Sequence, residues 1–263
     1  MKNPAAGGGR WVEVAPGRFV TWADEFARRH GGITEVVKDF GSTIVTFTAA
    51  DSAVAECHPP FPPLREPDEV DEPDRPLGPP APSDMARAIA AHAAADRTVA
   101  VLLVRLGGYA VGVFRDAPPV LVSSKTGSRL VHGRSAAGGW SQHRFARRRE
   151  KQAHEALGAA ADAAVAQFQQ HRHVDAVVLG GDRRAVAELA DDPRLAPYLA
   201  RTTDRFLTVP DPRLAVLRAT PRAFQAIRIR LTEPTPPALP SPHRPLNRPA
   251  GRLPACQLRS CAH

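Results

Sequence analysis

Apolar and polar residues alternate over residues 1–58 in a pattern that predicts a small α+β unit. Residues 11–14 form a short β-prone run, and Pro16 suits the first turn of a helix. Apolar residues then recur at helical spacing, at Phe19, Trp22, Ala23 and Phe26. Residues 33–37 and 43–48 are rich in β-branched side chains around a turn-prone stretch, which predicts a hairpin. Trp11 and Trp22 are candidates for stacking on bases, but packing in the core is the favoured interpretation.

Two proline-rich stretches interrupt the apolar pattern. Residues 59–83 hold ten prolines beside an acidic run, and such a composition buries little apolar surface and does not sustain a helix. Residues 234–263 hold eight prolines among polar and basic residues. We therefore predict a linker or surface loop at 59–83 and a disordered tail at 234–263.

The longest unit, residues 84–233, has the pattern of an α/β domain. Ser83 or Asp84 is expected to cap a short Ala-rich helix. Residues 99–106 form an almost continuous apolar run, typical of a central strand, and 109–114 would pair with it across a glycine turn. Further strands are predicted at 120–123, 129–131, 174–179, 205–209 and 226–231, and helices after Ser141, at 183–189, at 195–200 and from about 211. In the last strand the apolar residues alternate with Arg228 and Arg230, so one face would be core and the other basic.

A basic loop followed by a long helix stands out in the middle of this unit. Residues 134–139 have no apolar periodicity and end in a glycine pair, whereas helix formers dominate from Ser141 onward. Between residues 117 and 149 there are seven Lys or Arg and no acidic residue. Arg144, Arg147, Arg148 and Arg149 lie where a helix begins, a position unfavourable for cations unless an anion such as phosphate binds there. A solvated helical face is the alternative interpretation.

Whole-chain properties add weaker indications. The 263 residues are enough for one or two domains with a core, and a net charge of +8 with a pI near 10.2 favours an anionic partner. The three cysteines lack zinc-site spacing, so we expect neither a structural metal nor a disulfide framework. No secretory signal or membrane-spanning run is visible, which predicts a cytoplasmic protein without membrane contact; a monomer is expected.

The texts LLVRLGGYAVGVF and GGWSQHRFARRREKQ resemble the catalytic domain of archaeal and eukaryotic class I release factors. Within that group they are most similar to the actinobacterial branch of the Vms-like ribosome-rescue peptidyl-tRNA hydrolases, over approximately residues 95–232. The resemblance implies a ribonuclease H-like α/β fold with a mixed sheet and a long helix after a glycine-rich catalytic loop. It also implies cleavage of the ester between a nascent peptide and the tRNA, without any cofactor.

Carried over to this chain, the resemblance makes Gly138 and Gly139 the glycine pair of the catalytic loop and Gln142 its catalytic amide. Trp140 and Ser141 separate the glycines from the glutamine, which departs from the Gly-Gly-Gln order of termination factors. The implied partners are the large ribosomal subunit, its rRNA and peptidyl-tRNA. The residues expected to contact RNA are Lys125, Arg129, Arg134, Arg144, Arg147, Arg148, Arg149 and Lys151.

Other chemistries fit this loop less well. His132 and His143 are candidate general bases, although contact with RNA is the favoured role; Ser135 and Ser141 lack the context of a nucleophile. The turn at residues 180–182 resembles a phosphate-binding turn but lacks the rest of a P-loop or dinucleotide motif. A non-catalytic rRNA- or tRNA-binding module of release-factor-like or Pelota-like type remains the second hypothesis.

Overall fold

The computed structural model describes residues 3–4, 8–65, 81–105, 108–128 and 141–234, with side chains from residue 8 and, in the long helix, from His154 onward. The predicted tail after Pro234, most of the predicted linker and the predicted strand at 129–131 lie outside these residues. The N-terminal elements are β1 (Asn3–Pro4), β2 (Arg10–Val14), α1 (Pro16–Arg29), β3 (Ile33–Lys38), β4 (Val45–Ala49), β5 (Val54–His58) and α2 (Pro82–Ala94). They are followed by β6 (Val99–Arg105), β7 (Gly108–Arg115), β8 (Val120–Ser128), α3 (Ser141–Phe168), β9 (Ala176–Gly181), α4 (Arg183–Ala190), α5 (Ala196–Leu199), β10 (Thr202–Leu207), α6 (Leu214–Arg218), α7 (Thr220–Phe224) and β11 (Ile227–Thr232).

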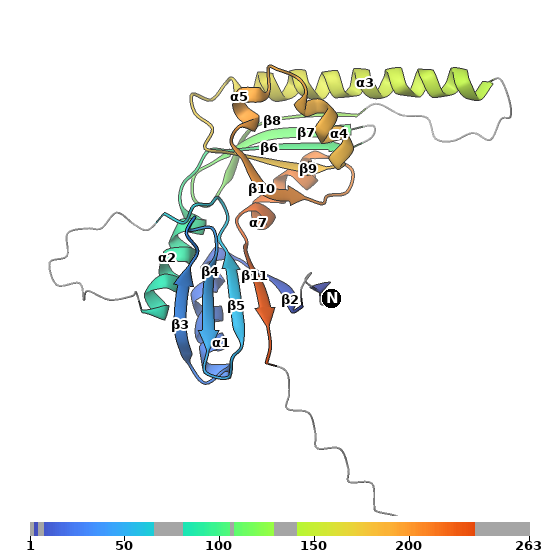
Figure 1. Cartoon of the computed structure of the whole chain (residues 1–263). Coiled ribbons are helices and arrows are strands. Elements are labelled where there is room, and N and C mark those ends of the chain that lie inside the picture. The colour runs from blue at the N-terminus through green and yellow to red at the C-terminus, as the bar shows by residue number, and fades with distance from the viewer. Residues whose placement is uncertain (1–2, 5–7, 66–80, 106–107, 129–140, 235–263) are drawn as a thin grey trace, which may run out of the picture.

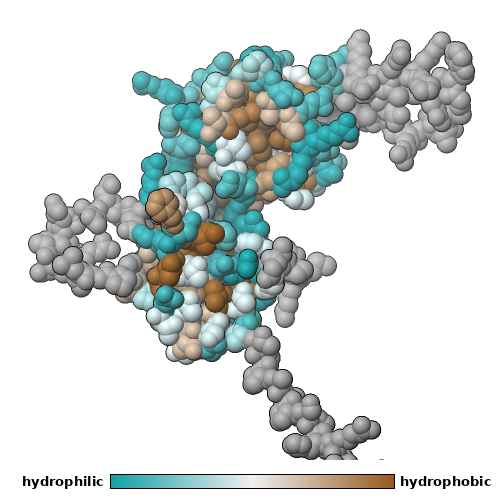
Figure 2. All heavy atoms as spheres, viewed as in Figure 1, coloured by the Kyte–Doolittle hydropathy of each residue, from teal (hydrophilic) through white to brown (hydrophobic). Residues whose placement is uncertain are grey.

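Six strands form sheet A, in the order β1-β2-β11-β5-β4-β3, with every pair antiparallel. Helices α1 and α2 cover one face, and the buried residues of this unit, among them Phe19, Phe47 and Ile229, lie between them and the sheet. The opposite face, called here the outer face of sheet A, carries hydrophilic and hydrophobic residues side by side rather than one continuous apolar patch (Figure 2).

Two elements that the sequence placed with the second unit instead form part of the first unit, around sheet A. Strand β11 lies between β2 and β5, with Ile229 opposite both Val12 and Cys57. Helix α2 packs against the core of sheet A through Met85 and Ile89. The predicted alternation of β11 is confirmed, since its three aliphatic residues are buried and its arginines are half-buried on the outer face. Strand β5 was not predicted.

Helix α2 also differs from expectation at its start. Ala81 occupies the N-cap position and no side chain caps the helix, whereas Ser83 and Asp84 lie inside the first turn. The expected capping role of these two residues was therefore wrong. Pro82 supplies the first helical residue, where the absence of an N–H group costs nothing.

Five strands form sheet B, in the order β10-β9-β6-β7-β8 (Figure 1). Strands β6, β7 and β8 are antiparallel neighbours, whereas β9 is parallel to β6 and β10 is parallel to β9. Helices α3, α4 and α5 pack on one face and α6 and α7 on the other, forming two apolar layers. Because both faces are covered, β6 is buried along nearly its whole length, as its continuous apolar sequence predicted.

Aromatic residues connect the two units. Phe224 at the end of α7 lies edge-on to Phe61, with ring centroids 6.0 Å apart, and to Phe114 on β7 at 5.6 Å. The guanidinium of Arg97 lies 5.0 Å from the ring centroid of Phe61. Within the described ranges, no helix has the length and apolar character needed to span a bilayer.

Candidate functional site

The predicted site lies where the edge strand β8 leads into helix α3. Lys125 is an exposed residue of β8. Gln142 is the second residue of α3, and Arg144, Arg147, Arg148, Arg149 and Lys151 follow within the first eleven residues of this helix, but their side chains lie outside the described part of the chain. Arg129, Arg134, Gly138 and Gly139 also lie outside it, as do the candidate bases His132 and the side chain of His143.

Helix α3 is anchored through its C-terminal half. Among its residues with described side chains, from His154 onward, the fully or nearly buried ones begin at Ala160 and end at Phe168, and they face the apolar layer that includes Val111 and Val113 of β7. His154 is 85% exposed. Because an α-helix rises 1.5 Å per residue, about 27 Å of helix separates Gln142 from Ala160. The start of α3 extends past the end of sheet B (Figure 1), so the segment bearing Gln142 projects from the domain.

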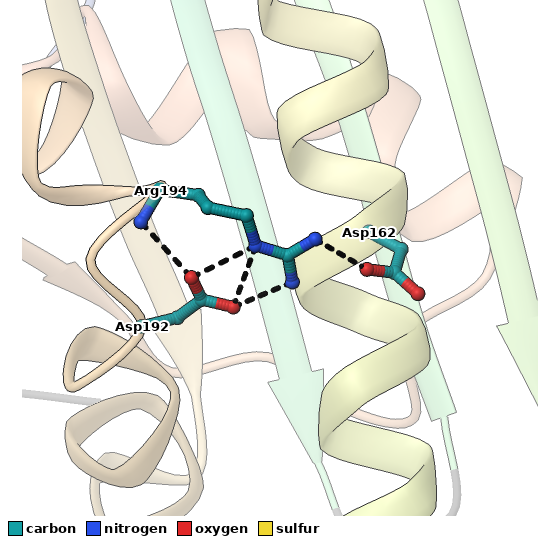
Figure 3. Close-up of polar contacts among 3 residues, drawn as sticks. All are labelled: Asp162, Asp192 and Arg194. Atoms are coloured by element: carbon teal, nitrogen blue, oxygen red, sulfur yellow. Dashed lines mark hydrogen bonds and ion pairs between the residues drawn. The ribbon is translucent and has the colours of Figure 1, made fainter.

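A polar contact fixes this anchored half to the loop after α4. Arg194 donates from Nη1 to Asp162 of α3 at 2.8 Å and from Nη2 to Asp192 at 2.7 Å (Figure 3). Asp192 also accepts the backbone N–H of Arg194 at 3.0 Å. These bonds from Arg194 lower the pKa of the Asp192 carboxyl. The loop thereby holds a guanidinium directed at the helix.

A second contact joins the other side of α3 to β8. His171, just after the helix, has Nε2 3.0 Å from the hydroxyl of Ser123. Burial lowers the pKa of His171, and the charge of Arg115 lowers it further, so the neutral imidazole is favoured. Strand β8 and the C-terminal end of α3 are thus held together on the side opposite the predicted loop.

Lys125 lies on the face of sheet B that α3 covers. A shift in register near Val122 brings Ser123 opposite Val113 and Lys125 opposite Val111. Residues directly opposite on neighbouring strands share a face, and both valines belong to the layer beneath α3. The structure therefore places Lys125 on the same side of the sheet as the basic helix.

Gly127 on β8 is a site-adjacent residue that the sequence did not single out. A Cβ at this position would lie 2.5 Å from the ring of Tyr109, which is opposite it on β7. The glycine therefore leaves room for this ring at the end of β8 that leads into the predicted loop. A glycine inside a β-prone run is the sequence signal that could have indicated it.

The turn at residues 180–182 has a structural explanation. A Cβ on Gly181 would lie 2.0 Å from the carbonyl oxygen of Val104, and Gly181 has a φ of +105°. Asp182 accepts the backbone N–H of Arg184 at 2.9 Å and so caps α4 itself. Gly181 thus permits close packing of β9 on β6, and the Asp182 carboxylate caps the helix end at which a phosphate would otherwise bind.

The two N-terminal tryptophans have different environments. Trp22 is stacked between Phe19 and Phe26, at 5.9 and 5.6 Å, and packs against the core of sheet A. Trp11 instead lies on the outer face, with Arg228 4.5 Å from its ring centroid and His58 edge-on at 5.2 Å. Core packing is therefore confirmed for Trp22, but it was wrong for Trp11.

The fold and the site together define an α/β unit that projects a basic helix from the edge of a mixed sheet. The family model described as Actinobacteria/chloroflexi VLRF1 release factor matches residues 97–230, slightly more than half of the chain. The chain belongs to this family, which confirms the resemblance to the actinobacterial Vms-like release factors. The matched range begins just before β6 and ends within β11. No curated protein sequence matches the chain.

Several solved structures show distant similarity, among them the following three. The structure titled Vms1 mitochondrial localization core is 12% identical, with a TM-score of 0.35, over 79% of this chain and 80% of that one. A structure titled Archaeal protein is 15% identical, with a TM-score of 0.31, over 79% and 62%. Dom34 from S. cerevisiae, titled a translation termination-like factor, is 10% identical, with a TM-score of 0.24, over 83% and 64%.

Proposed function

We propose that the protein is a peptidyl-tRNA hydrolase of the ribosome-rescue type, acting without codon recognition on peptidyl-tRNA held by stalled large ribosomal subunits. Gln142 is its catalytic residue, and Gly138 and Gly139 shape the loop before it. Membership of a release factor family supports this function. The order of strands in sheet B, three antiparallel and then two parallel, supports assigning its fold to the ribonuclease H-like type.

The observation that carries the proposal is the projecting start of α3. A glutamine in the first turn of a helix anchored about 27 Å away can enter a narrow space while the domain remains outside it. The arginines that follow Gln142 provide charge for the phosphates lining such a space. If the arginines only formed a solvated face of the helix, there would be no reason for a glutamine to precede them.

The reaction needs little from the protein besides positioning. A water molecule held by the Gln142 amide attacks the carbonyl carbon of the ester that joins the peptide to the tRNA. The tetrahedral intermediate then breaks its bond to the ribose oxygen of the terminal adenosine, which takes up the proton given up by the water and becomes a hydroxyl, and the peptide leaves as a carboxylic acid. A neutral amide orients the water without acting as a strong base, and the ribosome's own RNA can supply the groups that stabilise the oxyanion.

The experiment is release of a labelled peptide from peptidyl-tRNA on purified large subunits. Wild-type protein should release the peptide, and Gln142→Ala should bind the subunit normally but lose release by at least about 100-fold. Gln152→Ala is the matched control, because it removes the same amide from the same helix away from the loop. Normal subunit binding without release by any variant, wild type included, would instead establish the non-catalytic RNA-binding module.

A further inference from the structure

A cavity of about 270 Å³ lies at the junction of the two units, between the outer face of sheet A and strand β10. It is called here the junction cavity. Its apolar wall includes Trp11 and Phe224, and its polar wall consists of Thr43, His58, Thr203, Asp204, Arg205 and Arg228. The cavity is distant in the fold from α3, and the proposed hydrolysis makes no use of it.

Arg205 carries a largely buried guanidinium. It donates to the carbonyl oxygen of Ala223, and within the described residues it forms no ion pair with a carboxylate. Burial lowers the pKa of Arg205 to about 10; the charge of Glu13 partly offsets this, and the charge of Arg228 lowers the pKa further. A buried cation of this kind is stabilised by an anion that supplies the missing acceptors.

Arg228 brings a second guanidinium to the same cavity. It lies opposite both His58 and Glu13 in sheet A, and its guanidinium is over the ring of Trp11. Its Nε is 3.8 Å from Glu13, too far for a hydrogen bond, and this buried atom has no hydrogen-bond partner among the described residues. Glu13 itself lines a neighbouring cavity of about 700 Å³ rather than the junction cavity.

Thr203 completes a set of donors. Its hydroxyl is buried and has no hydrogen-bond partner within the described part of the chain. The described structure contains four such side-chain atoms, and two of them, on Thr203 and Arg228, belong to residues of the junction cavity. Buried polar atoms without partners are rare in folded proteins, so two at one cavity indicate a ligand with acceptor oxygens.

We propose that the junction cavity binds a phosphate group, with Arg205, Arg228 and Thr203 as donors and the Trp11 ring as an apolar wall. Forked guanidinium groups match phosphate oxygens, and Asp204, an exposed residue, is the only carboxylate among the described residues that line the cavity. The volume lies just below the usual range for small-molecule sites, so it suits a ligand no larger than one nucleotide. The phosphate belongs either to a free nucleotide or to a residue of RNA.

The test is titration of the full-length protein at constant ionic strength with inorganic phosphate, AMP and a single-stranded hexa-adenylate RNA. The Trp11 indole signal in nuclear magnetic resonance reports occupancy of the cavity. Wild type should bind at least one of these probes saturably, and Arg228→Gln and Arg205→Gln should weaken that binding by at least about ten-fold. Saturation by AMP or phosphate identifies a free ligand as the source, whereas saturation by the RNA alone identifies RNA.

Arg230→Gln is the matched control. Arg230 is two residues from Arg228 on the same strand and face, and its Nε is also among the buried atoms without a hydrogen-bond partner. It differs from Arg228 in that its Nε forms a close ion pair with Glu56 at 2.9 Å and it does not line the cavity. Replacement of Arg230 should leave binding of the probes unchanged. Gln142→Ala should also leave it unchanged, and this result would distinguish the junction cavity from the proposed catalytic site. If Arg205→Gln unfolds, Arg228→Gln decides. Absence of saturable binding of all three probes, or equal weakening by Arg228→Gln and Arg230→Gln, would overturn the proposal.

Discussion

Arg194 donates a hydrogen bond of 2.8 Å to Asp162, and this contact joins the loop after α4 to helix α3 (Figure 3). Asp162 lies in the half of α3 that packs on sheet B, twenty residues after Gln142. Because the start of the helix projects from the domain, the direction of its axis is determined by contacts in this anchored half. A small rotation there is amplified along the helix, so the contact matters more for positioning than its exposure suggests.

Replacing Arg194 with Ala should therefore lower peptide release more than it lowers stability. Arg194 and Asp162 are exposed and Asp192 is only partly buried, so we expect a small fall in the melting temperature at pH 7. The rate of peptide release from peptidyl-tRNA on large subunits should fall several-fold, because the helix no longer holds Gln142 in the correct direction. Arg184→Ala, on the neighbouring helix α4, is the control for removal of an exposed arginine. Equal activity of both variants would show that the contact does not position α3.

The same contact has a defined pH dependence. Arg194 lowers the pKa of Asp192 in the folded state, so this contribution to stability is present above the ordinary pKa of an aspartate. It disappears as pH falls through the lowered value, when the carboxylate takes up a proton. The difference in melting temperature between wild type and Arg194→Ala should therefore narrow below about pH 4. A difference that stays constant down to pH 2 would contradict this assignment.

Two glycine-to-alanine replacements should change stability in opposite directions. At Gly181 the positive φ and the proximity of the Val104 carbonyl leave no room for a Cβ, so we expect a decrease of about 3 kcal/mol in the free energy of unfolding. At Gly158, an exposed position in α3 with nothing within 4 Å, alanine should add about 0.5–1 kcal/mol through helix propensity. Chemical denaturation measures both, and a stable Gly181→Ala variant would show that the turn relaxes.

The local pattern of apolar residues predicted much of the fold, because a strand buried on both faces has a continuous apolar sequence and a strand buried on one face has an alternating one. The continuous apolar run of β6 indicated a strand covered on both sides, and the alternation of Ile227, Ile229 and Leu231 indicated β11. Neither pattern says which sheet a strand joins. The pairing of Ile229 with Val12 links residues more than 200 positions apart, and no local signal encodes it.

The parts of the candidate site that sequence alone could not reveal depend on tertiary contacts. The register shift in β8 decides which face Lys125 occupies, and a β-bulge has no reliable local pattern here. Strand β5 has a polar Glu56 and His58 among few apolar residues, which weakened its signal. The junction cavity combines residues from β2, β5, β10 and β11, so its charges converge only after both units are packed.

Acid should destabilise the fold through His92. This buried side chain accepts the backbone N–H of Arg65 on Nδ1 at 3.1 Å and donates from Nε2 to the Pro60 carbonyl at 3.0 Å, which requires the neutral imidazole. Burial lowers the pKa of His92, and the charge of Arg97 lowers it further. The unfolded chain then takes up a proton near pH 6.5 while the folded protein does not, so stability falls as pH decreases from about 7 to 5.

His92→Gln is the informative variant for this pH dependence. Glutamine keeps one donor and one acceptor but does not titrate. The slope of the unfolding free energy against pH between pH 7 and 5 should therefore decrease by the equivalent of up to one bound proton. The pKa values of His58 and His171 are also lowered by burial, so part of the slope should remain. Urea denaturation at several pH values measures it, and an unchanged slope would falsify the assignment to His92.

The basic start of α3 should govern the salt dependence of binding to large subunits. Removing one cation that touches a phosphate reduces the slope of log affinity against log salt by nearly one, so Arg147→Ala/Arg148→Ala should lower the slope by about 1.5 to 2. The control is Arg218→Ala/Arg222→Ala, which removes the same charge from exposed positions of α6 and α7, on the opposite face of sheet B. If both pairs reduce the slope equally, net charge rather than the start of α3 determines affinity. If only the first pair does so, the helix that carries Gln142 lies against RNA phosphates in the complex.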